Sequence, residues 1–111
     1  MKKILVTGGD GRFATELKKI KTKYIFIFLN KKHLDILKES SILKAINKYK
    51  PQAILHLAAL SRPMNVHIKK ISDSINLNII GTCNVVNACI RKKIKIIYFY
   101  KLYLSWKKRW L

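Results

Sequence analysis

The sequence is poor in acidic residues and cysteine, and it has no long apolar segment. It carries 5 Asp+Glu against 24 Lys+Arg in 111 residues, a formal net charge of +19. Two cysteines, Cys83 and Cys89, exclude a disulfide framework and are typical of reduced cytoplasmic thiols. The longest apolar run, Tyr24 to Leu29, is far shorter than the roughly 20 residues of a membrane span, and no secretory signal follows Met1. We therefore expect a cytoplasmic protein with no transmembrane helix.

The sequence also disfavours a metal site and intrinsic disorder. His33, His56 and His67 lack the spacing of metal ligands, which predicts no metal site. Half of the residues are hydrophobic, enough to bury a core that offsets the entropy lost on ordering the chain. The length suits one small domain or part of a larger one.

The positive charge has two competing explanations. Lys and Ile, both with A/T-rich codons, make up about a third of the chain, and the lysines are scattered in pairs instead of gathering around a recognition motif. Compositional bias is therefore favoured over selected binding of a polyanion. A basic α/β module that binds nucleic acid stays open as the alternative function, and attachment of 96–111 to a membrane surface as a weaker one.

Strand-like and helix-like segments alternate along the chain. The expected strands are Lys2–Thr7, Tyr24–Leu29, Ala53–Ala59 and Lys95–Phe99, and the expected helices are Arg12–Ile20, a helix capped by Ser40 or Ser41 and ended by Pro51, and 69–91. The long helix is expected to turn Ile71, Ile75, Ile79, Val86 and Ile90 toward the sheet. This order predicts an α/β fold with a doubly wound parallel sheet of the Rossmann type.

A glycine-rich turn stands between the first strand and the first helix. It has the pattern G-x-x-G-x-x-A, formed by Gly8, Gly11 and Ala14. A dinucleotide pyrophosphate needs a tight turn, a bare backbone and free N–H groups, and this segment offers all three. A turn without a ligand is the less favoured interpretation.

Three further segments resemble the extended short-chain dehydrogenase/reductase family. They are Leu34-Asp35-Ile36, His56-Leu57-Ala58-Ala59 and Asn78-Ile79-Ile80-Gly81-Thr82, which follow the turn in the family's order. The layout around 28–36 is most similar to the dTDP-4-dehydrorhamnose reductases and related nucleotide-sugar reductases and epimerases. The resemblance covers residues 1–99.

The resemblance implies a hydride transfer between a nicotinamide cofactor and a nucleotide-linked sugar substrate. The cofactor-binding residues that it implies lie in the glycine turn, near the adenine, beside the ribose and on the long helix; they are Gly8, Gly11, Arg12, Phe13, Ala14, Asp35, Ile36, Leu57, Ala58, Ala59 and Asn78.

The end of the second strand bears on cofactor choice. NAD-selective sites place a carboxylate there to hold the ribose 2′-hydroxyl, and the same charge repels a 2′-phosphate. This chain has Asn30, Lys31 and Lys32 instead. We therefore expect NADP(H), with NAD(H) as the other possibility.

The last residues depart from the family pattern. Tyr100 stands where the family has a Ser or Thr. The family's Tyr-x-x-x-Lys comes much further along the chain, whereas the one Tyr-x-x-x-Lys of this sequence, Tyr103 to Lys107, lies directly behind Tyr100. We interpret 1–99 as the NAD(P)-binding half of a Rossmann fold, truncated after about its fourth main strand, and 100–111 as a frameshifted or non-native basic-aromatic tail. No catalytic residue is assigned, and the chain alone is expected to be inactive.

Overall fold

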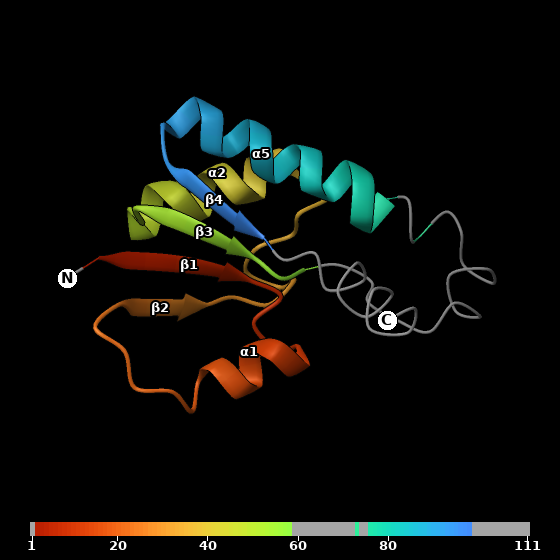
Figure 1. The fold of residues 1–111 in the computed structure, drawn as a ribbon. Helices are drawn as coiled ribbons and strands as arrows, with labels where there is room; N and C mark the ends of the chain where they lie inside the picture. Colours follow the sequence, from red (N-terminus) through yellow and green to blue (C-terminus); the bar gives the residue numbers. More distant parts are fainter. Residues whose placement is uncertain (1, 59–72, 74–75, 99–111) are drawn as a thin grey trace, which may run out of the picture.

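Four parallel strands form one sheet with helices on both faces (Figure 1). The computed structural model describes residues 2–58, 73 and 76–98. The elements are β1 (Lys3–Thr7), α1 (Arg12–Leu17), β2 (Ile25–Phe28), α2 (Glu39–Tyr49), β3 (Ala53–His56), the π-helical turn η1 (Asn76–Ile80), α5 (Gly81–Lys92) and β4 (Lys95–Tyr98). The proposed tail 100–111, like Ile71 and Ile75, lies outside the described residues.

The order of the strands confirms the doubly wound arrangement. The sheet runs β2-β1-β3-β4, so the chain moves to one side of β1 for β2 and returns to the other side for β3. In Figure 1, α1 lies on one face of the sheet, and α2 and α5 lie on the other. Ligands of such sheets bind at the carboxyl ends of the strands where the direction of winding changes. Here that point lies between β1 and β3.

The strands are shorter than expected, and they differ in burial. Residues 4–7 of β1 and all of β3 are buried, as expected for central strands of a parallel sheet. The apolar run Tyr24–Leu29 is not buried on both faces, because β2 lies at the edge of the sheet. Ile25 is exposed there, and the next three residues are half-buried.

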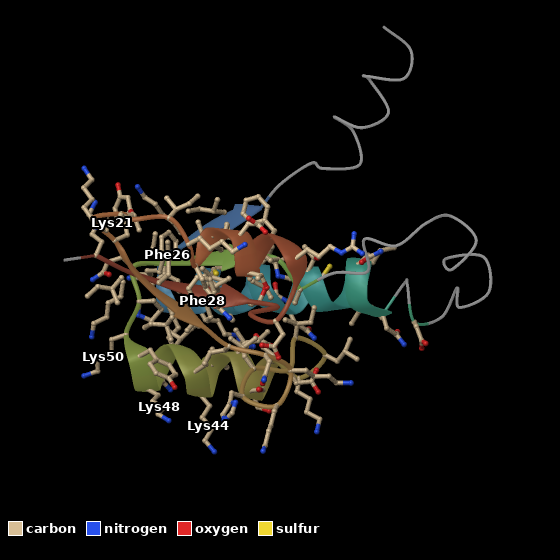
Figure 2. The ribbon with its side chains drawn as sticks, turned by 90° about the horizontal axis from the view of Figure 1, so that it is seen from below. Lys21, Phe26, Phe28, Lys44, Lys48 and Lys50 are labelled. Atoms are coloured by element: carbon tan, nitrogen blue, oxygen red, sulfur yellow. The ribbon has the colours of Figure 1, made fainter. Side chains whose placement is uncertain are left out.

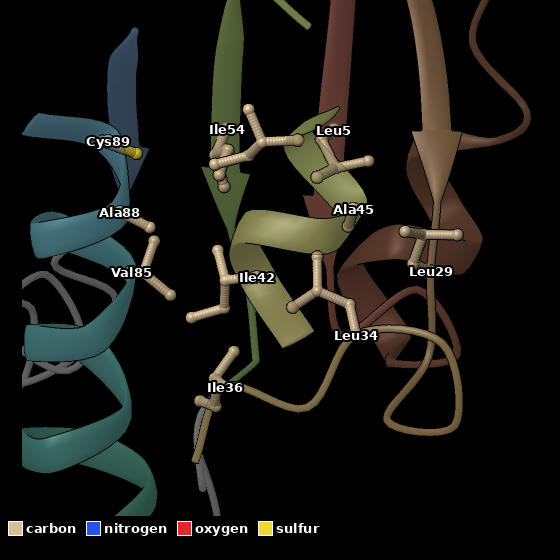
Figure 3. Close-up of a cluster of buried hydrophobic side chains, with 11 residues drawn as sticks. Leu5, Leu29, Leu34, Ile36, Ile42, Ala45, Ile54, Val85, Ala88 and Cys89 are labelled. Atoms are coloured by element: carbon tan, nitrogen blue, oxygen red, sulfur yellow. The ribbon is translucent and has the colours of Figure 1, made fainter. Parts of the chain in front are cut away.

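Most of the core lies between the sheet and the pair α2 and α5 (Figure 3). Leu5 and Ile54 point from the central strands into this cluster, and Ile42 and Val85 enter it from the two helices; all four are fully buried. A smaller cluster on the face of α1 contains Ile4, Val6, Ala53 and Leu55. Alternation along β1 thus supplies both layers.

α1 is shorter than the expected Arg12–Ile20, because it ends at Leu17. The two lysines that follow lie beyond the helix. Lys18 Nζ lies 5.0 Å from the centre of the Phe28 ring, and Lys19 Nζ lies 3.2 Å from Glu16 Oε1. Because α1 has only six residues, few aligned peptide dipoles add up behind the glycine turn.

The predicted buried face of the last helix is wrong. Ile79 and Ile90 are 58% and 68% exposed, whereas the buried residues are Gly81, Val85, Ala88 and Cys89. η1 precedes α5 directly, and its wider π turn changes the helical phase that the isoleucine spacing implied. Small side chains instead let α5 pack closely, and burial raises the pKa of the Cys89 thiol to about 11.

α2 begins one residue before the expected serine caps, at Glu39, with Lys38 at the N-cap and no side-chain cap. The Oγ of Ser41 instead accepts a hydrogen bond from the N–H of Asp35 at 2.9 Å. Serine thus fastens the loop before the helix.

A buried polar network joins β1, β3 and α5. Thr7 Oγ1 accepts the N–H groups of Leu57 and Ala58, both at 3.0 Å, and lies 2.9 Å from His56 Nδ1. Both lone pairs of this hydroxyl are used, so its own hydrogen is donated to His56 Nδ1. The proton on Nε2 is then donated to Thr82 Oγ1 at 3.1 Å. Burial lowers the pKa of His56 to about 4, which keeps the ring neutral.

Two helices end on lysines in the left-handed conformation. Lys50 after α2 has φ 48°, and Lys93 after α5 has φ 55°. Glycine usually occupies such positions, because a Cβ there is strained. Both lysines are exposed, and their backbone N–H groups still close the last helical turn.

None of the helices in the described part of the chain combines the length and apolar character that crossing a membrane requires.

Lys50→Gly is expected to raise the free energy of unfolding by about 1 kcal/mol, because it removes the strain of a Cβ at positive φ. Lys48→Gly is the matched control. It lies inside α2 and is expected to lower the same free energy by about 1 kcal/mol. Urea unfolding followed by circular dichroism measures both. A loss of stability in both variants would contradict the strain at Lys50.

Acid is expected to destabilise the protein through His56. Below pH 6.5 the unfolded chain protonates this ring, whereas the folded chain does so only near pH 4. Stability is therefore fully present above pH 6.5 and falls by about 3 kcal/mol as the pH drops to 4.

Urea unfolding at several pH values, compared between the wild type and His56→Gln, measures this part of the pH dependence. The variant should lose it, and His33→Gln, which changes an exposed histidine, should keep it. Equal pH slopes for the wild type and His56→Gln would show that His56 is protonated equally in both states.

Candidate functional site

A cavity of about 440 Å³ opens where β1, β2 and β3 end. Its volume lies within the range of small-molecule sites. The lining residues come from the glycine turn, from the segment after β2 and from the segment after β3; they are Gly8, Asp10, Gly11, Asn30, Lys31, Lys32, Leu57 and Ala58. All except Asp10 are residues that the sequence predicted to bind a cofactor. The fold thus brings three separate segments to one cavity.

The glycine turn is wedged between the segments that follow β2 and β3. Gly8 has φ 65°, and a Cβ on it would lie 2.9 Å from Ala58 Cα. A Cβ on Gly9 would lie 2.8 Å from the backbone N of Leu29, whose carbonyl accepts the Gly9 N–H at 2.8 Å. Neither position can hold a side chain without moving a backbone. Sequence reasoning passed over Gly9, although the Gly-Gly pair was the signal for it.

Gly11 has a different reason to lack a side chain. Its φ of −72° and ψ of 170° suit any residue, and a Cβ would meet one atom, Gly8 O at 3.2 Å. Its N–H donates to that carbonyl at 3.0 Å, and its own carbonyl accepts from the N–H and hydroxyl of Thr15. Since Gly11 lines the cavity, its bare backbone leaves room for a ligand.

Asn30 organises the end of β2. Its Nδ2 donates to Asp10 Oδ2 at 3.1 Å, and its Oδ1 accepts the N–H of Lys32 at 3.0 Å. The amide therefore connects the segment after β2 to the glycine turn. Asp10 is a site residue that sequence reasoning missed, because the pattern of the turn leaves its position unspecified and its partner lies 20 residues further along the chain.

The charge of the cavity is mixed. Lys31 and Lys32 are exposed and line it together with one carboxylate, that of Asp10. Other lysines point away in several directions, as Figure 2 shows for Lys21 near β2 and Lys44 on the outer side of α2. The described lysines therefore do not form a single stripe.

The remaining predicted site residues lie outside the lining. Arg12 and Phe13 are exposed at the start of α1, whereas Ala14 is fully buried beneath it. In Rossmann folds a small residue at this position of the pattern lets the first helix pack on the sheet.

The adenine and helix motifs also lie outside the lining of the cavity. Ile36 is buried in the core, and Asp35 is half-buried, with Oδ1 accepting the N–H of Leu37 at 3.0 Å. Asn78 is half-buried in η1. Ala59 lies outside the described residues.

Several solved structures share this fold. The dTDP-4-dehydrorhamnose reductase from Bacillus anthracis str. Ames, in complex with NADP, matches with a TM-score of 0.81 and 25% identity over 88% of this chain and 36% of its own. The dTDP-4-dehydrorhamnose reductase from Clostridium acetobutylicum matches with a TM-score of 0.72 and 25% identity, over 85% of this chain and 34% of its own. A GDP-L-fucose synthetase from Naegleria fowleri, bound to NADP, matches with a TM-score of 0.69 and 28% identity, over 87% of this chain and 29% of its own.

This chain thus spans about a third of the length of the structures that it matches. A search of curated protein sequences gave no significant match. The family model described as the RmlD substrate binding domain matches residues 1–103, which is nearly the whole sequence. On that match, this chain belongs to the RmlD substrate binding domain family.

Proposed function

We propose that the cavity binds the adenosine diphosphate half of NADP(H). The observation that carries this proposal is that two glycines of one turn, Gly8 and Gly11, line the same cavity as two lysines, Lys31 and Lys32. Two similar structures were solved with NADP. NAD(H) is the second cofactor that the site would accept.

Each group of lining residues has a part in this binding. The backbone around Gly8 and Gly11 would face the pyrophosphate, and Leu57 and Ala58 would flank the adenosine ribose. Lys31 and Lys32 would hold the 2′-phosphate, because ammonium groups form strong charge-assisted hydrogen bonds with phosphate oxygens. The tether from Asn30 to Asp10 would position this end of the cavity.

The other predicted residues would act at the margins of the same site. Arg12 and Phe13 would lie beside the phosphates, and Ala59 would flank the ribose together with Ala58. Asp35 would contact the adenine, and Ile36, buried in the core, would support it from behind. Asn78 would act from the start of the long helix. Ala14 would support the turn from below, where it is fully buried. These roles rest on the family motifs.

The proposed reaction of the complete fold is hydride transfer to or from a nucleotide-linked sugar in the cytoplasm. The nicotinamide supplies the hydride chemistry when it is bound. Residues 1–99 would supply the cofactor-binding half, and 100–111 would be the non-native tail. In the family a Tyr-x-x-x-Lys well beyond the fourth strand supplies the proton donor. The pair with this spacing here, Tyr103 and Lys107, belongs to the proposed tail, so we expect the chain to bind cofactor without turnover.

Gly11→Ala is expected to lower the affinity for NADPH by about tenfold or more, because its methyl group would occupy the space next to the pyrophosphate. The fold should persist, since the backbone angles of Gly11 suit alanine. NADPH fluorescence titration measures the affinity, and thermal melting checks the fold. Wild-type affinity in a folded Gly11→Ala variant would contradict the assigned position of the pyrophosphate.

Replacing Lys31 and Lys32 together by alanine is expected to weaken NADP binding by about tenfold to a hundredfold, because two charge-assisted contacts with the 2′-phosphate are lost. NAD binding should change little. The matched control is the double replacement of Lys44 and Lys48, which removes the same charge from the outer side of α2.

Isothermal titration with NADP and NAD at fixed salt measures both double variants. If the two variants weakened NADP binding equally, the lysines would act through net charge alone. If the chain instead bound RNA with steep salt dependence and ignored NADPH, the nucleic-acid alternative would replace this proposal.

A further inference from the structure

We propose that Asp10 is a cofactor-selecting residue, whose carboxylate accepts a hydrogen bond from the ribose 2′-hydroxyl of NAD(H) and opposes the 2′-phosphate of NADP(H). This inference rests on the proposed function and adds to it a group that works against the two lysines. The preference of the site for NADP(H) then depends on the balance between the attraction of the two lysines for the 2′-phosphate and its repulsion by Asp10.

The position of Asp10 is set by its hydrogen bond. Asn30 Nδ2 donates to Asp10 Oδ2 at 3.1 Å, and Asn30 in turn is held through its Oδ1 by the N–H of Lys32. His33 Nδ1 lies 3.4 Å from the same oxygen. The side chain of Asn30 is thus engaged on both of its polar atoms, so its role is to position the carboxylate.

The carboxylate stands where the ribose end of a dinucleotide is selected. In Rossmann folds an acidic residue at the end of the second strand holds the 2′-hydroxyl. This chain has Asn30 at that end of β2, and Asn30 brings in a carboxylate from the glycine turn instead. Asp10 lines the same cavity as Lys31 and Lys32. An acidic group is therefore present near the proposed position of the ribose 2′ group, although it comes from the glycine turn and not from β2.

The chemistry of the two cofactors gives the direction of the effect. A carboxylate accepts hydrogen bonds and suits a hydroxyl donor, but it repels a phosphate dianion. Lys31 and Lys32 have the opposite preference, since they attract the phosphate and gain less from a neutral hydroxyl. Asp10 therefore lowers the preference for the phosphorylated cofactor that the lysines create.

Asp10→Asn tests this directly, because it removes the charge while its side-chain oxygen can still accept the hydrogen bond from Asn30. The probes are ADP-ribose and 2′-phospho-ADP-ribose, which differ in that phosphate alone and need no nicotinamide contacts. We expect the ratio of their dissociation constants to shift about tenfold toward the phosphorylated probe. Glu16→Gln, on exposed α1, removes the same charge away from the cavity and should leave the ratio unchanged.

A second variant controls for the possibility that Asp10→Asn changes the conformation of the glycine turn. Asn30→Ala releases the carboxylate without removing its charge, so the ratio should move in the same direction by a smaller factor. Thermal melting of each variant reports whether the turn is intact.

The outcomes separate this inference from the proposed function. An unchanged ratio in folded Asp10→Asn, or an equal shift in Glu16→Gln, overturns the role of Asp10 and leaves cofactor binding intact. Failure of the wild type to bind either probe overturns the proposed function and this inference together. The role of Asp10 is supported if the ratio of the dissociation constants shifts about tenfold in Asp10→Asn, shifts less in Asn30→Ala and stays unchanged in Glu16→Gln.

Discussion

The hydroxyl of Thr7 is the contact on which the site depends. It accepts two backbone N–H groups from the segment after β3 and donates to His56, so the ends of the two central strands are held together by one oxygen. This leaves so little space that a Cβ on Gly8 would lie 2.9 Å from Ala58. The cavity exists because the glycine turn and Ala58 are fixed side by side. Neutral His56 extends the same network to Thr82 on α5, so the helix layer and the ligand edge of the sheet are mechanically connected.

The site relies on backbone geometry more than on the field of a helix. α1 has only six residues, so few peptide dipoles add up along its axis. The turn is instead held by main-chain bonds, with Gly9 fixed to the carbonyl of Leu29 and Gly11 to that of Gly8. Charge selection is then left to side chains after β2 and to Asp10. In the proposed complex, the backbone of the turn would bind the phosphates, and the side chains of Asp10, Lys31 and Lys32 would select the ribose.

The sequence pattern predicted those parts of the fold that neighbouring residues determine, namely the strands, the helices and their order. The β-branched run before the glycines became β1, and the strand-helix alternation gave the parallel sheet, because burial on both faces dictates that composition. The face of α5 could not be predicted from isoleucine spacing, since η1 shifts the helical phase and isoleucine is common throughout this chain. The bond from Asn30 to Asp10 joins residues 20 positions apart. A linear pattern cannot show such a pair, because it forms only after β1 and β2 align.

The left-handed lysines show how a biased composition is distributed over a fold. The chain has only four glycines: Gly8, Gly9 and Gly11 form the ligand turn, and Gly81 packs against Ile36. Lys50 and Lys93 occupy helix ends where glycine is usual, and the strain there is about 1 kcal/mol each. A lysine is tolerated at these exposed helix ends, where it affects only a backbone dihedral angle. Glycine stands where a Cβ would press on a neighbouring backbone, as at Gly8 and Gly9, so three of the four glycines of this chain lie together in the turn after β1.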